Sequence, residues 1–120
     1  MNDDPIAELQ TKLRSFAKAR DWEQFHTPKN LAMALSGEVG ELVEIFQWLT
    51  PNQADHVMQG QRSADVEDEL ADVFIYLLRL ADVLGIDLAR AAHAKIGRNE
   101  LRYPAQPGTE PAEAGARDPS

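Results

Sequence analysis

The chain has no cysteine, few basic residues and no long apolar run, and each absence excludes a class of site or partner. Without cysteine, disulfides and thiolate metal sites are excluded, and a reducing cytoplasm is the expected location. With 12 Lys and Arg against 20 Asp and Glu, the net charge is −8, which argues against nucleic acid or an anionic membrane as the main partner. No apolar stretch approaches the length of a membrane span, and the N-terminus lacks the features of a secretory signal. We therefore expect a soluble protein of the cytoplasm.

The length of 120 residues suits one domain with an adequate but not generous core. We expect this domain to cover residues 1–104. Residues 105–120 are rich in Pro, Gly, Ala and Glu and too poor in apolar bulk to order themselves, so we predict a disordered tail. Because the core is modest, dimerisation would stabilise the fold.

Helix start and stop signals predict an all-α fold with four helices and no strand. The predicted helices run from Pro5 to about Asp21, from Pro28 to about Leu49, from Ser63 to Leu84 and from Asp87 to about Arg102. Asp3 or Asp4, Thr27, Ser63 and Asp87 are the expected caps or starting residues, Gly85 is the expected stop, and residues 52–61 are expected to form a loop. Residues 70–84 are apolar on nearly every side. One small four-helix layer would not bury all of that surface, so we predict a dimer or a dimer of dimers.

Two acidic pairs lie on helices that otherwise read as buried. Glu38 and Glu41 form the first pair, and Glu69 and Asp72 form the second. At a spacing of three, both carboxylates of a pair point the same way. Solvated helix faces are the ordinary explanation of such spacing, but carboxylates among apolar residues need a positive partner. If the two helices face each other, oxygen-only ligation favours Mg²⁺, with Mn²⁺ as a substitute.

Gly37 and Gly40 alternate with the acids in the middle of a helix, where each costs about 1 kcal/mol relative to alanine. Two explanations are equally good: close packing against another helix, or room beside the carboxylates for a metal and phosphate.

The aromatic residues around this helix are a second feature. Trp22, Phe25 and His26 precede it and Trp48 closes it, so they are candidates for the walls of a pocket for a flat base, although core packing is the commoner role of such residues.

The run SGEVGELVEIFQW followed by EDELADVFIYLLRLA resembles the all-α nucleoside triphosphate pyrophosphohydrolases of the MazG type. Within that family, RDWEQFHTPKNLAMALSGEVGELVEIFQW and the later RYP are most similar to the dCTP pyrophosphatase branch. The resemblance covers about residues 9–104. It implies Mg²⁺-dependent hydrolysis between the α and β phosphates, with dCTP or modified cytosine deoxynucleotides as substrates and nucleotide-pool housecleaning as the role.

The resemblance also implies roles for particular residues. It makes Glu38, Glu41, Glu69 and Asp72 the metal ligands. Glu44 lies at the edge of the same face and is a candidate general base beside Glu41, with an ordinary surface glutamate as the equal alternative. The resemblance places Trp22, His26, Trp48 and Tyr76 in contact with the base, and Lys95, Asn99 and Tyr103 in contact with the rest of the substrate. Lys29 is a separate candidate for a phosphate contact, because it lies just inside the start of the second helix, where anions are favoured. The number of metal ions, the identity of the base, the choice of dimer or tetramer and the sharing of pockets between subunits all stay open.

Two other functions compete with this hypothesis. A di-iron or di-manganese carboxylate bundle would use Glu-x-x-His on two helices, and Glu23 with His26 is the single pair of that spacing. A non-catalytic helical module that binds nucleotide without turnover would not need all four acidic ligands, yet all four are present.

Overall fold

The structure is a computed structural model that describes residues 4–107, and all regular secondary structure in that range is helical. In chain order the elements are α1 (Pro5–Ala19), η1 (Glu23–Phe25), α2 (Pro28–Phe46), α3 (Pro51–Asp55), η2 (Val57–Gln59), α4 (Ser63–Leu84) and α5 (Leu88–Arg102). The chain divides after Ile86 into two compact units, of which the first carries α1 to α4 and the second carries α5. The all-α fold class is confirmed, and the single domain over residues 1–104 stays a prediction. Most of the predicted disordered tail, residues 108–120, lies outside the described residues.

Side-chain caps start three of the long helices where the sequence predicts them. A side-chain oxygen at each cap accepts a hydrogen bond from a backbone N–H of the first turn. The three caps are Asp4 for α1, Thr27 for α2 and Asp87 for α5. Gly85 ends α4 in the left-handed conformation, with φ at 71°, which is the predicted stop.

The segment between α2 and α4 differs from the prediction. Helix α2 ends at Phe46, and the expected loop contains α3 and η2. Thr50 and Gln53 form a capping box: the Thr50 N–H donates to Oε1 of Gln53 at 2.9 Å, and the Gln53 N–H donates to Oγ1 of Thr50 at 3.2 Å. Pro51 then occupies the first helical position, where a proline favours a helix start as well as ending the one before.

The start of α4 also differs from the prediction. Ser63 is its first helical residue and not its cap, and no side chain of the preceding Arg62 caps the helix. Arg62 instead donates from Nε to Oδ2 of Asp65 at 2.7 Å, an exposed ion pair within the first turn.

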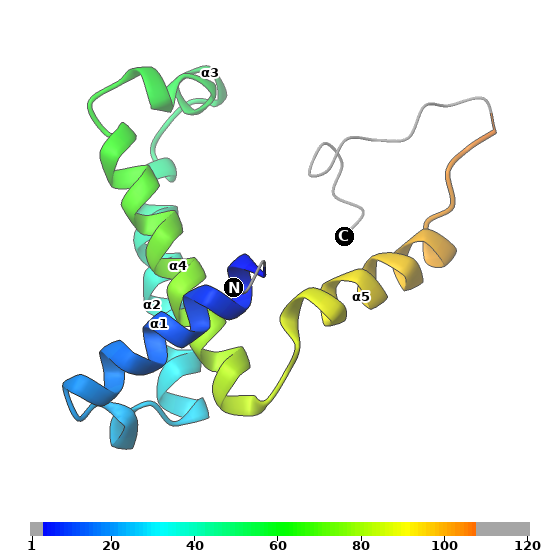
Figure 1. The fold of residues 1–120 in the computed structure, drawn as a ribbon. Helices are drawn as coiled ribbons and strands as arrows, with labels where there is room; N and C mark the ends of the chain where they lie inside the picture. Colours follow the sequence, from blue (N-terminus) through cyan, green and yellow to red (C-terminus); the bar gives the residue numbers. More distant parts are fainter. Residues whose placement is uncertain (1–3, 108–120) are drawn as a thin grey trace. The chain divides into compact units, whose positions relative to one another are not determined.

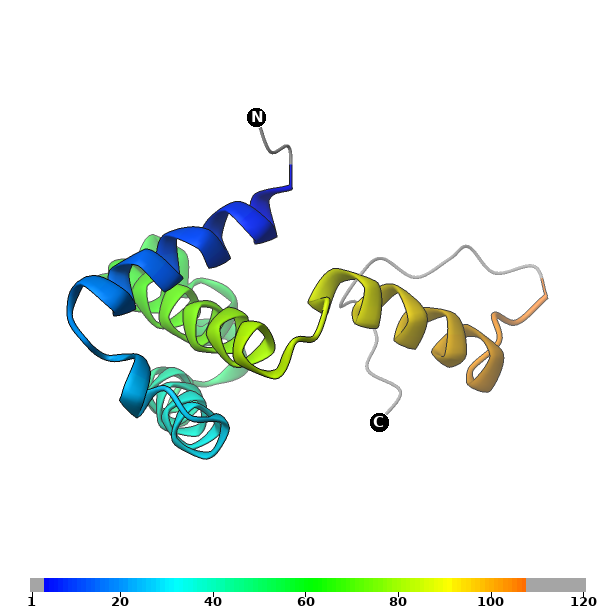
Figure 2. The ribbon, with the colours of Figure 1, turned by 60° about the horizontal axis from the view of Figure 1, so that its bottom comes forward.

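Helix α4 is the centre of the first unit. Figures 1 and 2 show α2 running along α4 and α1 crossing it on another side. The fully buried side chains Leu31 of α2 and Leu78 of α4 are each 1% exposed and belong to the core of this unit. This packing brings the acidic segments of α2 and α4 against one another.

Large apolar side chains remain half exposed on the first unit. On α2 and α4 they include Val39, Val43, Leu70, Phe74 and Ile75. A soluble single chain rarely leaves so much apolar surface open, which agrees with the predicted oligomer without testing it. Of the described helices, none has the length and apolar character needed to cross a membrane.

Candidate active site

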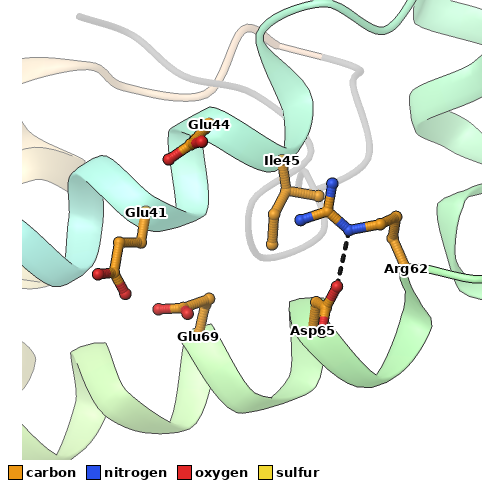
Figure 3. Close-up of a pocket in the computed structure, with 6 residues that line it drawn as sticks. All are labelled: Glu41, Glu44, Ile45, Arg62, Asp65 and Glu69. Atoms are coloured by element: carbon orange, nitrogen blue, oxygen red, sulfur yellow. Dashed lines mark hydrogen bonds and ion pairs between the residues drawn. The ribbon is translucent and has the colours of Figure 1, made fainter.

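Three of the four predicted carboxylate ligands converge between α2 and α4. One oxygen each of Glu38, Glu41 and Glu69 lies within 4.8 Å of the others. Figure 3 shows Glu41 of α2 and Glu69 of α4 directed toward each other across the gap between their helices. The spacing of three within the first pair and the packing of α2 on α4 therefore bring the carboxylates to one point.

The carboxylates of this cluster are crowded and partly buried, which disfavours their charged forms. Oε2 of Glu38 and Oε2 of Glu69 are buried and have no hydrogen-bond partner among the described residues. Burial is the main cause that raises the pKa of Glu69 to about 7, and the neighbouring Glu38 and Glu41 carboxyls add to the rise. Burial is also the main cause that raises the pKa of Glu38. Two orphaned carboxylate oxygens beside a third acid are a donor set that suits a hard divalent cation.

Asp72 lies near the carboxylate cluster and also lines a separate cavity. It follows Glu69 by one turn of α4, and its charge raises the pKa of Glu38. It does not belong to the close group of three carboxylates. Instead it lines a cavity of about 330 Å³ at the side of α4 that faces α1. The carboxylates and this cavity are therefore neighbours along one helix.

Aromatic and apolar side chains form most of the second cavity. Its lining consists of Leu13, Phe16, Trp22, His26, Asp72, Ile75, Tyr76 and Arg79. The Phe16 and Trp22 rings meet edge to face with centroids 5.6 Å apart, and the Trp22 and His26 centroids lie 6.3 Å apart. Three residues predicted to contact the base, Trp22, His26 and Tyr76, are thus brought together. The cavity has the size and the flat walls that a nucleobase requires.

The turn after α1 places Trp22 in this cavity. Asp21 adopts φ at 56°, and the next N–H, that of Trp22, donates back to the Ala17 carbonyl at 2.9 Å. The Asp21 N–H donates to the Lys18 carbonyl at 3.1 Å. This pair of bonds is a Schellman motif, in which aspartate is one of the few non-glycine residues that tolerate the left-handed position. The turn reverses the chain and directs Trp22 back toward Phe16.

Sequence reasoning missed four residues of the lining. Leu13 and Phe16 are apolar residues of α1, and Ile75 belongs to the apolar run of α4. Apolar residues on a helix are commonly part of a core, so their type alone does not indicate a cavity. Arg79 follows Tyr76 by three residues and Asp72 by seven, so helical periodicity places all three on one face of α4. Its spacing from Asp72 and Tyr76 is therefore the feature of the sequence that identifies Arg79 as a lining residue.

The remaining predicted site residues lie elsewhere. Glu44 is exposed and lines the acidic pocket of Figure 3 with Glu41, Ile45, Arg62, Asp65 and Glu69. Trp48 is 85% exposed and Phe25 is 60% exposed, and neither lines the aromatic cavity. Lys29 is exposed in the first turn of α2. Lys95 and Asn99 lie one turn apart on α5, and Tyr103 follows its end, so all three belong to the second unit.

The competing di-metal motif receives no support from His26. Its Nδ1 accepts a hydrogen bond from Nε of Arg79 at 3.0 Å, and Glu23 lies in the short η1 helix. Neither residue belongs to the carboxylate group that can hold an ion.

The two glycines of α2 have open space where a side chain would begin. A Cβ at Gly37 or Gly40 would meet no atom within 4 Å among the described residues, so packing within the chain does not require either glycine. We expect Gly37→Ala to raise the free energy of unfolding of the metal-free protein by about 0.5–1 kcal/mol, because alanine loses less backbone entropy in a helix. Urea unfolding at matched pH measures this change. A destabilised variant would show that another molecule or a second copy packs against Gly37.

Comparisons with known proteins agree with this architecture. Residues 33–115 match the model of the MazG-like family. Curated relatives include dCTP pyrophosphatase 1 of Homo sapiens, 50% identical over 101 residues, which are 83% of this chain and 59% of that protein. The protein of the same name from Rattus norvegicus is 49% identical over 100 residues, 82% of this chain and 59% of the relative. This chain thus spans about 59% of the length of these relatives.

A solved structure extends the likeness to the fold. The crystal structure of a pyrophosphatase from Archaeoglobus fulgidus superposes with a TM-score of 0.81 at 43% identity, and the match covers 88% of this chain and 97% of that one. The chain belongs to the MazG-like family.

Proposed function

We propose that this chain hydrolyses nucleoside triphosphates between the α and β phosphates and depends on Mg²⁺, for which Mn²⁺ substitutes. The position of Asp72 carries the proposal, since it lines the aromatic cavity and acts electrostatically on Glu38 of the carboxylate cluster. Aromatic walls accept a flat base, and acids that hold a cation accept a polyphosphate. A nucleoside triphosphate is the ligand that offers both groups on one molecule.

The names of the relatives support a narrower substrate class. The curated relatives are dCTP pyrophosphatases, and the similar solved structure is a pyrophosphatase. We therefore propose dCTP and modified cytosine deoxynucleotides as substrates, with removal of unwanted nucleotides from the pool as the role. The products are the nucleoside monophosphate and pyrophosphate.

The acidic residues divide the work of the reaction in this proposal. Glu38, Glu41, Glu69 and Asp72 hold the cation. A bound divalent cation neutralises the triphosphate and makes a water molecule easier to deprotonate. Glu44 lies one turn from Glu41 in the lining of the same pocket and is the candidate to accept that proton, with Glu41 as the alternative base. Attack of the water oxygen on the α phosphorus breaks the bond to the bridging oxygen, and pyrophosphate leaves.

A second copy of the chain would complete the substrate site. Trp48 is a large aromatic residue with most of its surface exposed, and half-exposed apolar side chains cover parts of α2 and α4. We propose a dimer or tetramer in which such surfaces meet, with Trp48, Lys29, Lys95, Asn99 and Tyr103 as further substrate contacts. Sedimentation equilibrium of the full chain tests the assembly; a monomer at micromolar concentration would contradict it.

Release of pyrophosphate tests the function directly. The full chain is incubated with Mg²⁺ and a panel of canonical and modified nucleotides, and phosphate is measured with and without added inorganic pyrophosphatase. We expect phosphate that depends on the added pyrophosphatase, with the highest kcat/KM for dCTP or a modified cytosine deoxynucleotide. Nucleotide binding without any pyrophosphate would instead support the non-catalytic module.

Replacement of Trp22 by alanine should weaken substrate binding. Loss of one stacking face costs about 1–3 kcal/mol per base in single-stranded nucleic-acid sites, so we expect KM to rise about 5-fold to 140-fold with a smaller change in kcat. Phe25→Ala is the matched control, because Phe25 lies three residues away and does not line the cavity. Equal effects of the two substitutions would argue against the aromatic cavity as the base site.

A further inference from the structure

Among the residues that the structure describes, Arg79 is the one charged residue that is buried, with only 8% of its surface exposed. It lines the aromatic cavity, yet its guanidinium is occupied by two neighbours. Nε donates to Nδ1 of His26 at 3.0 Å, and Nη1 donates to Oδ2 of Asp82 at 3.3 Å. A buried cation needs such partners, because burial without them costs several kcal/mol.

The direction of the first bond fixes the state of the histidine ring. A guanidinium has donors only, so Nδ1 of His26 must be the acceptor and carries no proton. In a neutral imidazole the proton then resides on Nε2. On these grounds we infer that Arg79 is a positioning residue, which holds His26 in the tautomer that offers its Nε2–H to a ligand in the aromatic cavity.

The anchor for Arg79 comes from two helices. Asp82 lies one turn further along α4 and also accepts from Nε of Arg14 in α1, at 2.7 Å. The carboxylate is therefore shared by two guanidinium groups, only one of which reaches His26. Burial, and secondarily the charge of Arg79, lower the pKa of His26, so the ring stays neutral near neutral pH.

The ligand that fits this arrangement carries an acceptor on a flat ring. This step depends on the proposed function, in which the cavity holds the nucleobase. A pyrimidine base presents a ring carbonyl oxygen and, in cytosine, a ring nitrogen, and either accepts from an N–H donor. A donor whose orientation is fixed before binding discriminates better than one that must be ordered on binding.

Nuclear magnetic resonance of the ¹⁵N-labelled full chain tests the tautomer without any substrate. We expect a scalar coupling between Nε of Arg79 and Nδ1 of His26 across the hydrogen bond, and an unprotonated Nδ1 in long-range ¹H–¹⁵N spectra. His56 is an internal reference of the opposite kind, because its Nδ1 lies 2.8 Å from the Asn52 carbonyl and must carry the proton when the ring is neutral. A protonated Nδ1 on His26 in the unmodified protein would overturn the inference, whatever the fate of any variant.

A double-mutant cycle separates positioning from direct contact. We expect Arg79→Met and His26→Phe each to lower kcat/KM for dCTP about tenfold, through the loss of one oriented hydrogen bond. The double variant should be no worse than His26→Phe, because Arg79 acts through His26. Additive losses, about a hundredfold in the double variant, would show that Arg79 contacts the substrate itself and would overturn the inference.

Arg14→Met is the matched control, since it removes the other guanidinium on Asp82 and leaves the Arg79 bond to His26 in place. Its kcat/KM should stay within about twofold of the unmodified protein. Failure of the proposed function can be told apart from failure of this inference. An unmodified chain that hydrolyses no nucleotide would still show the coupling between Arg79 and His26 and the His26 tautomer.

Discussion

Glu41→Gln is expected to lower kcat/KM by about two to three orders of magnitude. One oxygen of Glu41 lies within 4.8 Å of ligand atoms on Glu38 and Glu69, so its charge is part of the cluster that would hold the cation. Metal-ion catalysis contributes several kcal/mol of charge stabilisation, and each 1.36 kcal/mol is tenfold in rate. Glutamine is nearly isosteric and a good helix former, so the fold should persist. Steady-state kinetics of pyrophosphate release at saturating Mg²⁺ measures the loss.

Two comparisons make the Glu41 result specific. Glu67→Gln removes an equal charge from an exposed position of α4, and its kcat/KM should stay within about twofold. Unfolding of metal-free Glu41→Gln should require as much urea as the unmodified protein or more, because one like charge leaves a crowded site. Turnover of Glu41→Gln at the unmodified rate would remove Glu41 from the catalytic site.

Metal-free protein should lose stability as the pH rises from about 4.5 through about 7, and a divalent cation should reverse that loss. The folded-state pKa of Glu69 is about 7, above its ordinary value of 4.5. Folded protein therefore binds this proton more tightly than unfolded protein between these two values, and its contribution to stability is full at low pH and disappears as pH rises through the folded-state pKa. Glu38 acts in the same direction, because its pKa is also raised.

Thermal unfolding in EDTA and in Mg²⁺ measures both effects. The lowered pKa of His26 has the opposite sign, since unfolding exposes a ring that binds a proton more readily. The difference in free energy of unfolding between the unmodified protein and Glu69→Gln isolates the contribution of the Glu69 carboxylate. Relative to the unmodified protein, Glu69→Gln should become more stable as the pH rises. Mg²⁺ at a thousandfold its Kd should add about 4 kcal/mol to the free energy of unfolding. A fixed Mg²⁺ concentration should stabilise the protein more at pH 8 than at pH 6, because protons compete for the ligands. A Glu69→Gln difference that is flat across pH, or a Tm indifferent to Mg²⁺, would contradict the metal site.

Local chemistry in the sequence was sufficient for most helix boundaries. Asp4, Thr27 and Asp87 cap their helices, and Gly85 ends α4, because these effects depend on a few neighbouring residues only. The short α3 helix escaped prediction for an equally local reason. Pro51 follows the predicted end of the second helix near Leu49 and by itself indicates a stop, whereas with the capping box of Thr50 it also starts a helix.

The sequence by itself determined the all-α fold, the family and the shared direction of Glu38 and Glu41, because helical periodicity and motif order are properties of neighbouring residues. Tertiary structure decided which carboxylates meet. Packing of α2 on α4 brings Glu38, Glu41 and Glu69 together and leaves Asp72 facing the aromatic cavity. It also joins Arg79 to His26, 53 residues apart in the chain. Charge and hydrogen bonding act through space, so distances between helices, which no local pattern encodes, set the pKa of Glu69 and the tautomer of His26.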